Sequence, residues 1–283
     1  MRSIIGFSMR VYRASPFYPR LGRSLARVMA LATRFRSSKP IIHEVDGIQY
    51  ELDLREVIDS SLYYSGTFEA QAERAIAAAL KPGMIAIDVG ANIGYHTFRM
   101  ARAVGPAGRV VAIEPTAAAF AKLNCNGGLN DFKNIEYVKC GISDKDLGAT
   151  EIAFQSSYRL DGTCVDTVET VRLVTLDTLF SELKLPRVDF IKLDIDGFEG
   201  KAFRGAAKTL AAHHPTLLFE ISPSAMKKNG DDSAELIRML RELKYTFKSE
   251  KGEPIGDIDA FCAGIANDCS ANLVASAGEK SAS

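Results

Sequence analysis

The stretch of sequence that decides the fold is MIAIDVGANIGYHT, at residues 84–97. It begins with a short apolar run that predicts a buried strand, and residues 93–104 have the spacing of a helix. Between strand and helix, Gly90 and Gly94 allow the backbone to turn tightly and to approach a ligand, because neither carries a Cβ atom. Asn92 is one of the few other residue types that tolerate a left-handed conformation. The helix start points free amides at the same place, so we expect a ligand-binding loop here.

Apolar strands and helices alternate along the rest of the chain. Strands are predicted at residues 84–89, 109–113, 135–139, 188–193 and 216–221, with another near 271–275. Helices are predicted at residues 68–80, 93–104, 117–129, 198–213 and 233–243. Two other strand-rich pieces are a hairpin at 41–54 around the turn pair Asp46-Gly47 and an insertion at 150–175, clearest in VRLVTLDTL. The alternation predicts an α/β fold: a seven-stranded, mostly parallel sheet with helices on both faces, preceded by the β-hairpin.

The first 40 residues differ from the rest in charge. They carry eight Arg and Lys39 but no acidic residue, whereas the remainder carries 26 basic against 35 acidic groups. Apolar residues recur at helical spacing through residues 21–35, which predicts a basic amphipathic helix. Such a helix can lie on an anionic membrane surface, or pack its apolar stripe on the protein, and an organelle transit peptide is a third reading. We therefore divide the chain into a basic N-terminal segment at 1–40, a main domain at 41–275 and a flexible tail at 276–283.

Composition excludes several classes of protein. The acidic balance of the main domain argues against nucleic-acid binding, which requires a basic surface. Five cysteines without a CxxC pair fit reduced thiols better than a disulfide framework or a zinc site; they are Cys125, Cys140, Cys164, Cys262 and Cys269. No apolar run approaches the length of about 18 residues that a membrane span needs, and no secretory signal is recognisable. The expected location is the cytoplasm, with peripheral membrane contact through residues 1–40 left open, and no pattern indicates an oligomeric state.

The residues of the loop indicate which ligand it holds. A dinucleotide-binding loop has the pattern GxGxxG, but here Asn92 and Tyr95 stand at the second and third glycine positions. Asp88 places a carboxylate two residues before Gly90, where it would repel a pyrophosphate. S-adenosylmethionine has no phosphate and carries a sulfonium and an ammonium group, which a carboxylate attracts. The loop therefore favours S-adenosylmethionine as the cofactor, and a glycine turn without a ligand is the alternative.

Two further strand ends carry side chains suited to an adenosyl group. Glu114 ends the second strand, twenty residues after Gly94, where a carboxylate can accept hydrogen bonds from both ribose hydroxyls. Ser143 and Asp144 follow the third strand, and the Asp144 carboxylate can accept from the exocyclic amine of adenine. A Ser-Asp pair is also ordinary turn chemistry, and a lone strand-end glutamate is often only a solvated charge. Both alternatives stay open.

The last two parallel strands end in acids at the edge of the sheet where donor and acceptor should meet. IKLDIDGFEG contains Asp194, Asp196 and Glu199, and Glu220 ends the next strand. Carboxylates can hold Mg²⁺, but this spacing is not a known metal pattern, so no metal is predicted. An alcohol acceptor must lose its proton, which makes Asp194 and Glu220 the candidate catalytic bases. His96, in the first turn of the helix after the loop, is the reserve candidate, with a water-satisfied histidine on a helix surface as the alternative.

Four stretches resemble the FkbM-type methyltransferases, a branch of the Rossmann-like class I methyltransferases. They are KPGMIAIDVGANIGYHT at 81–97, VAIEP at 111–115, LVTLD at 173–177 and VDFIKLDIDGFE at 188–199. The upstream GTFE at 66–69 resembles the segment that precedes the core helix of that family and caps its donor site. The resemblance implies a Rossmann-like fold, S-adenosylmethionine as cofactor, and donor-binding roles for Glu69, Asp88, Gly90, Asn92, Gly94, Thr97 and Glu114. It also implies that Asp194 lines the active site, although the family commonly has Glu where this chain has Asp196.

By analogy, the resemblance implies methylation of a hydroxyl oxygen on a small molecule, a sugar or a glycan. One alternative is a non-catalytic module that keeps the adenosyl pocket while the basic helix docks to a membrane or a partner. The other is a nicotinamide-dependent oxidoreductase. The intact set of Asp88, Gly90, Gly94 and Glu114 argues against a decayed site, and the missing glycines of the dinucleotide pattern argue against the oxidoreductase.

Overall fold

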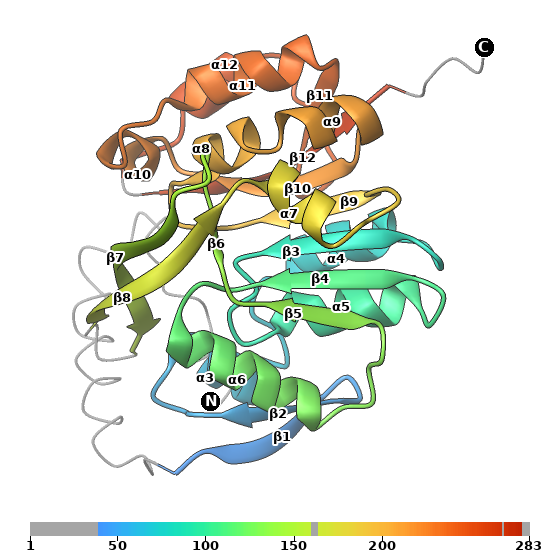
Figure 1. Ribbon diagram of the computed structural model, residues 1–283, viewed down its shortest axis with the longest axis vertical. Helices are drawn as coiled ribbons and strands as arrows, with labels where there is room; N and C mark the ends of the chain where they lie inside the picture. Colours follow the sequence, from blue (N-terminus) through green and yellow to red (C-terminus); the bar gives the residue numbers. More distant parts are fainter. Residues whose placement is uncertain (1–38, 160–163, 268, 279–283) are drawn as a thin grey trace. The chain divides into compact units, whose positions relative to one another are not determined.

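The computed structural model describes residues 39–159, 164–267 and 269–278 (Figure 1). Contacts divide the chain into two compact units. The first comprises the described part of Met1–Ala70 with Thr116–Asp131 and Glu151–Glu169, and the second comprises the described parts of Gln71–Pro115, Phe132–Thr150 and Thr170–Ser283. The predicted basic helix and nearly all of the segment 1–40 lie outside the described residues, so that division stays a prediction. Among the helices that are described, none is long and apolar enough to cross a membrane.

The second unit is built on a seven-stranded sheet with the strand order β11-β12-β10-β9-β3-β4-β5. The strands are β3 (Ile85–Val89), β4 (Arg109–Ile113), β5 (Ile135–Val138), β9 (Phe190–Leu193), β10 (Thr216–Ile221), β11 (Tyr245–Ser249) and β12 (Ala271–Ala277). Every pairing from β10 to β5 is parallel, whereas β12 runs antiparallel to both of its neighbours. The prediction of a seven-stranded, mostly parallel sheet is therefore confirmed.

The order of the strands reverses between β3 and β9. From β3 the chain adds β4 and β5 on one side, and it later adds β9 and β10 on the other. Such a reversal opens a crevice outside the carboxyl ends of the two central strands, and ligands of open parallel sheets bind there. The loop predicted to bind the ligand begins at the carboxyl end of β3, which is one side of this crevice.

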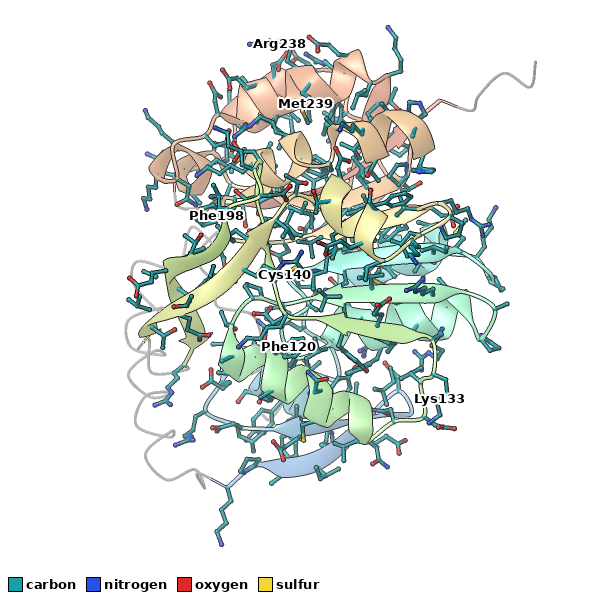
Figure 2. The ribbon with its side chains drawn as sticks, viewed as in Figure 1. Phe120, Lys133, Cys140, Phe198, Arg238 and Met239 are labelled. Carbon is teal, nitrogen blue, oxygen red and sulfur yellow. The ribbon has the colours of Figure 1, made fainter. Side chains whose placement is uncertain are left out.

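Helices of the second unit cover both faces of the sheet (Figure 1). On one face, α4 (Ala70–Ala79) and α5 (Tyr95–Val104) pack Ile76 and Met100 against Phe190 and other strand residues. The core on the other face of the sheet contains buried residues from six of the helices that the structure describes. They are α7 (Leu176–Glu182), α8 (Glu199–Arg204), α9 (Ala207–His213), α10 (Pro223–Lys228), α11 (Ser233–Glu242) and α12 (Ile258–Ala263). Cys140, labelled in Figure 2, is fully buried in this second core. Its burial raises the pKa of the Cys140 thiol to about 11, so this cysteine stays protonated.

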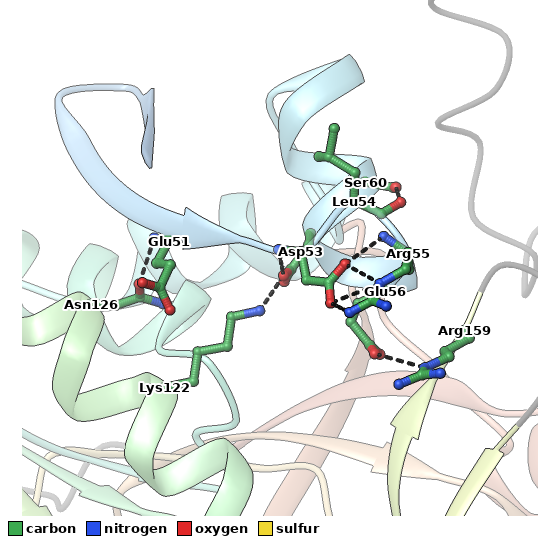
Figure 3. A network of polar contacts seen from close by, with 10 residues as sticks. Glu51, Asp53, Leu54, Arg55, Glu56, Ser60, Lys122, Asn126 and Arg159 are labelled. Carbon is green, nitrogen blue, oxygen red and sulfur yellow. Dashed lines mark hydrogen bonds and ion pairs between the residues drawn. The ribbon is translucent and has the colours of Figure 1, made fainter. Parts of the chain in front are cut away.

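The first unit contains the predicted hairpin, formed by β1 (Ile41–Val45) and β2 (Ile48–Leu52). Asp46 and Gly47 have φ angles of 52° and 74°, as a two-residue hairpin turn requires. The unit also contains α3 (Val57–Ser65) and α6 (Ala117–Gly128). The α6 side chain of Asn126 accepts a hydrogen bond at 2.7 Å from the backbone of Glu51 in β2, which fixes this helix against the hairpin (Figure 3).

Asp59 of α3 belongs to a polar network in the first unit with Asp53 and Lys122. It is 1% exposed, accepts a hydrogen bond at 2.6 Å from the backbone of Asp53, and forms an ion pair with Lys122 of α6. Burial raises the pKa of the Asp59 carboxyl, and the adjacent Lys122 ammonium opposes that shift. A buried carboxylate next to an ammonium group holds α3 and α6 together, because either charge alone would be uncompensated.

Some sequence predictions of secondary structure were wrong. The strand-rich insertion predicted at 150–175 is present, and its strand β8 (Cys164–Val174) stops at Val174. The last residues of VRLVTLDTL form α7 instead of strand, capped by the Thr175 hydroxyl, which accepts from the Thr178 amide. With β6 (Gly141–Ile142) and β7 (Gly148–Tyr158), β8 forms a three-stranded sheet in the order β6-β8-β7. The helix predicted at 198–213 is divided into α8 and α9 at Gly205, where a Cβ atom would lie 2.0 Å from the Ser143 carbonyl oxygen. The sequence also gave no prediction for α3, α10, β11 or α12.

The core packing gives a test of the fold. Phe203 of α8 and Phe219 of β10 are each 1% exposed, and their rings meet edge to face with centroids 5.2 Å apart. Phe219→Ala should therefore lower the free energy of unfolding by about 3–5 kcal/mol, the usual cost of removing a buried phenylalanine ring. Urea denaturation of the purified variants measures this change. Val168→Ala is the control, because Val168 is 70% exposed; equal effects of the two substitutions would contradict the assigned core.

Candidate active site

The loop after β3 has the backbone conformation that its sequence predicts. Gly90, Asn92 and Gly94 have φ angles of 82°, 49° and 91°, all in the left-handed region. The backbone amide of Gly90 donates to the carbonyl of Ile113 at the end of β4, over 3.0 Å. The amide of Asn92 donates to Glu114 Oε2 at 3.0 Å. The loop and the Glu114 carboxylate are therefore held to each other by a direct hydrogen bond.

Gly90 is also constrained by the neighbouring strand. A Cβ atom at Gly90 would lie 2.1 Å from the backbone carbonyl oxygen of Asp194, at the end of β9. The Asp194 amide in turn donates to the carbonyl of Val89 at 3.1 Å. Gly90 therefore permits a close approach of the loop to the backbone of Asp194, a contact that the sequence pattern did not predict. Its predicted contact with a ligand stays a prediction.

Asp88 lies inside the sheet. Its exposure is 0%, and its Oδ2 atom accepts a hydrogen bond at 2.6 Å from the Thr97 hydroxyl of α5. Its Oδ1 atom lies 3.4 Å from the ammonium nitrogen of Lys192 in β9. Thr97, predicted at the donor site, thus contacts Asp88 and is itself fully buried. Sequence reasoning missed Lys192, although a lysine inside the apolar strand VDFIKL was a visible signal.

The two candidate bases lie at the ends of adjacent strands. Leu193 of β9 is paired with Phe219 of β10 in parallel register, and Asp194 and Glu220 each follow by one residue. The Asp194 side chain is 25% exposed, and its Oδ2 atom lies 3.8 Å from the Lys192 ammonium. Glu220 is 6% exposed and its Oε1 atom accepts a hydrogen bond at 2.6 Å from the Ser270 hydroxyl. The structure therefore brings both acids to the same edge of the sheet.

His96 is not a surface histidine. It is 6% exposed in the first turn of α5, and its ring lies edge to face with that of Tyr95 at a centroid distance of 4.8 Å. The interpretation of His96 as a solvated residue on a helix surface was therefore wrong, because the first turn of α5 is buried on every side. The catalytic role of His96 stays a prediction.

Asp144 faces a charged partner. Ser143 and Asp144 follow β6, and Asp144 Oδ2 lies 3.7 Å from Nη2 of Arg204 in α8. Arg204 binds Asp231 with both terminal nitrogens, at 2.8 and 3.1 Å. The Asp144 carboxylate therefore has a charged partner on one side and is partly exposed to solvent, and its predicted contact with adenine stays a prediction.

Glu69 directly precedes α4 and belongs to the first unit, whereas the other predicted site residues belong to the second. Its predicted role in capping the donor stays a prediction. No group of three or more histidine, cysteine, aspartate or glutamate side chains is placed to hold a metal ion in the described ranges.

Glu199 is a buried acid beside the candidate bases. It has 0% exposure, and its Oε1 atom accepts a hydrogen bond at 3.0 Å from the amide of Ile195. Burial raises the pKa of Glu199 to about 8, and the negative charges of Asp194 and Glu220 add to that effect. Glu199 therefore holds a proton at neutral pH, which the sequence pattern alone did not reveal.

Comparison with known proteins identifies the family. A model of the FkbM methyltransferase domain matches residues 88–247, which is more than half of the chain. The chain belongs to the FkbM methyltransferase family. S-adenosylmethionine, the cofactor predicted from the sequence, is the methyl donor of this family. The matched residues include the carboxyl end of β3 and all of β4, β9 and β10, and the acids described above lie at these strand ends.

Individual relatives of this FkbM-family chain are distant. An arsenite methyltransferase of Halobacterium salinarum is 35% identical over 60 residues, which covers 21% of this chain and only 15% of that protein. Methyltransferase FkbM from Methylobacillus flagellatus has 16% identity and a TM-score of 0.41, covering 73% of this chain and 58% of that one. The structure of M. jannaschii TYW2 in complex with AdoMet has 14% identity and a TM-score of 0.46. The match covers 85% of this chain and 86% of that one.

The raised pKa of Glu199 predicts a dependence of stability on pH. The folded protein keeps the Glu199 proton up to about pH 8, whereas an ordinary glutamate loses it near 4.5. The stabilisation is complete below the ordinary pKa and is lost as pH rises through the folded value. Glu199→Gln removes this loss, so the variant should gain stability relative to wild type between pH 5 and 8, by at most about 1.4 kcal/mol per pH unit.

Urea denaturation of both proteins at several pH values measures the effect. Glu242→Gln is the matched control, because Glu242 is exposed. A difference between Glu199→Gln and wild type that does not change with pH would show that Glu199 is ionised in the folded protein.

Proposed function

We propose that this protein transfers a methyl group from S-adenosylmethionine to a hydroxyl oxygen of a small molecule, a sugar or a glycan. The observation that carries the proposal is that acids at the carboxyl ends of β4, β9 and β10 lie around the switch point between β3 and β9. Glu114 ends β4 and is bonded to the loop after β3, and Asp194 and Glu220 end β9 and β10. In a family of methyltransferases, these acids lie where an open parallel sheet binds its ligand.

The donor is held by the loop and by Glu114. The start of α5 supplies backbone amides, and the left-handed conformation of Asn92 and Gly94 brings the chain into the helix. Glu114 accepts one hydrogen bond from the loop, so its carboxylate is oriented before the ribose hydroxyls arrive. A preorganised acceptor of this kind loses little entropy when the ligand binds.

The reaction is an in-line displacement. A lone pair of the acceptor oxygen forms the new C–O bond to the methyl carbon while the C–S bond breaks, and its electron pair returns to sulfur. The hydroxyl proton passes to Asp194 or Glu220, the two acids at the edge of β9 and β10. The sulfonium is already an activated methyl donor, so the protein contributes mainly alignment, removal of water and a place for the proton.

Incubation with isotopically labelled S-adenosylmethionine and host extract tests the function. We expect label in a methyl ether, and we expect S-adenosylmethionine but not NAD to raise the melting temperature, because a ligand stabilises the state that it binds. A shift with NAD alone would favour the oxidoreductase. Binding of the donor without transfer to any acceptor would favour the non-catalytic module.

Glu114 provides a test of the donor site. If its carboxylate binds the ribose diol, Glu114→Ala should weaken the affinity for S-adenosylmethionine by about 1.5–3 kcal/mol, the range for hydrogen bonds to a charged group. Isothermal titration calorimetry measures the affinity, and the exposed Glu253→Ala serves as the control. Unchanged affinity in a folded Glu114→Ala variant would reduce Glu114 to a residue that only orders the loop.

Asp194→Asn and Glu220→Gln separate the two candidate bases. Each substitution keeps the shape of the side chain and removes its ability to accept the proton. The residue that acts as base should lose about 10²–10⁴-fold in turnover, with a much smaller change in donor affinity. The measurements are kcat at saturating donor and the donor dissociation constant. Normal turnover in both variants would remove both acids from the role of base.

A further inference from the structure

Lys192 carries a charge in the middle of the sheet. It lies in β9 with Asp88 of β3 and Leu218 of β10 as its register partners, and it is 4% exposed. A lysine buried between two paired strands loses most of its hydration, which must be replaced by opposite charge. The negatively charged groups beside the Lys192 ammonium therefore indicate the role of Lys192.

Among the residues that the structure describes, Asp88 and Asp194 provide carboxylates for that compensation, and they differ in exposure. The Lys192 ammonium lies 3.4 Å from Asp88 Oδ1 and 3.8 Å from Asp194 Oδ2. The Asp88 side chain is 0% exposed and its other oxygen accepts the Thr97 hydroxyl, whereas the Asp194 side chain is 25% exposed. Asp88 thus directs its oxygens to partners inside the protein, while Asp194 also faces solvent at the switch point.

We propose that Lys192 is a positioning residue: it neutralises Asp88 inside the sheet and fixes Asp194 as the carboxylate presented to the positive groups of the donor. This inference rests on the proposed function, because it takes S-adenosylmethionine as the ligand. The sulfonium and ammonium groups of the donor require negative charge nearby. Of the two acids that Lys192 contacts, Asp194 has the exposed surface that a ligand can reach.

A cycle of stability measurements tests the pairing inside the sheet. Lys192→Met removes the ammonium and leaves Asp88 without compensation, so the midpoint of urea denaturation should fall. Adding Asp88→Asn should restore most of that midpoint, because both buried charges are then gone. Adding Asp194→Asn instead is the matched control and should restore less, because Asp194 is partly solvated.

Failure of Asp88→Asn to restore the midpoint, or a better rescue by Asp194→Asn, would overturn the pairing. If Lys192→Met alone does not fold, the readout is whether the variant with Asp88→Asn folds and the variant with Asp194→Asn does not.

Calorimetric titration with S-adenosylmethionine tests the presentation of Asp194. Asp194→Asn should weaken binding about 10- to 100-fold, the equivalent of losing a hydrogen bond to a charged group. With Asp194 on the donor, Glu220 is the candidate base of the two acids. Asp88→Asn should weaken the affinity less than Asp194→Asn does, because the Asp88 side chain is fully buried whereas Asp194 has exposed surface. The Lys192→Met/Asp88→Asn variant should bind more weakly than wild type but more tightly than Asp194→Asn.

The decisive variant combines all three substitutions. Because Lys192 acts through Asp194, adding Asp194→Asn to Lys192→Met/Asp88→Asn should give no greater loss than Asp194→Asn alone. Additive losses, full affinity of Lys192→Met/Asp88→Asn, or an Asp88→Asn variant as weak as Asp194→Asn would each overturn the proposal. If wild type binds neither S-adenosylmethionine nor its demethylated product, the proposed function fails and the role of Asp194 fails with it. The stability cycle still decides the pairing of Lys192 with Asp88.

Discussion

The parallel pairing of β3 with β9 is the constraint on which the rest of the second unit depends. The two strands are far apart in sequence: the amide of Ile85 donates to Asp189 Oδ2 at 2.8 Å across a separation of 104 residues. Closing so long a loop costs entropy, which only a continuous set of contacts can offset. Register partners Asp88 and Lys192 supply one such contact, and the fit of Gly90 against the Asp194 carbonyl supplies another. Because the loop after β3 and Asp194 follow these two strands, the pairing of β3 with β9 also brings these parts of the candidate site together.

The buried polar groups explain why the sequence predicted some elements and not others. β4 and β10 were predicted with the observed bounds, because each is an apolar run between turn residues and is buried on both faces. In contrast, α3 was not predicted. It buries Asp59, Ser60 and Ser61, and the Ser60 hydroxyl donates to the Leu54 carbonyl at 2.5 Å. A helix that places polar side chains inward has no apolar periodicity to read, since its stability comes from hydrogen bonds to particular partners.

The same distinction applies to the candidate site. The sequence identified the loop and its left-handed positions, because glycine and asparagine report directly on backbone conformation. It placed Asp194 and Glu220 at one edge, because the ends of neighbouring parallel strands meet there. It did not reveal that Asp88 points into the sheet, which depends on how the Lys192 and Thr97 side chains pack around it. The apolar pattern of the sequence predicts where a strand ends. The direction of a charged side chain cannot be predicted in this way, because it depends on the partners that surround it in the folded protein.

The partners of the buried acids determine how much negative charge a ligand meets at the carboxyl edge of the sheet. Asp88 and Lys192 form a buried pair of opposite charge, and Glu199 holds a proton at neutral pH because burial raises its pKa to about 8. Counting strand-end acids from the sequence therefore overstates the negative charge that a ligand meets. Glu114, Asp194 and Glu220 remain, each at the end of a different strand. In the proposed function, the donor has two positive groups and needs negative charge at its sulfonium end, and the acceptor hydroxyl needs a base beside it. Because Asp88 is paired inside the sheet and Glu199 holds a proton, the proposed function assigns the chemistry of the site to Glu114, Asp194 and Glu220.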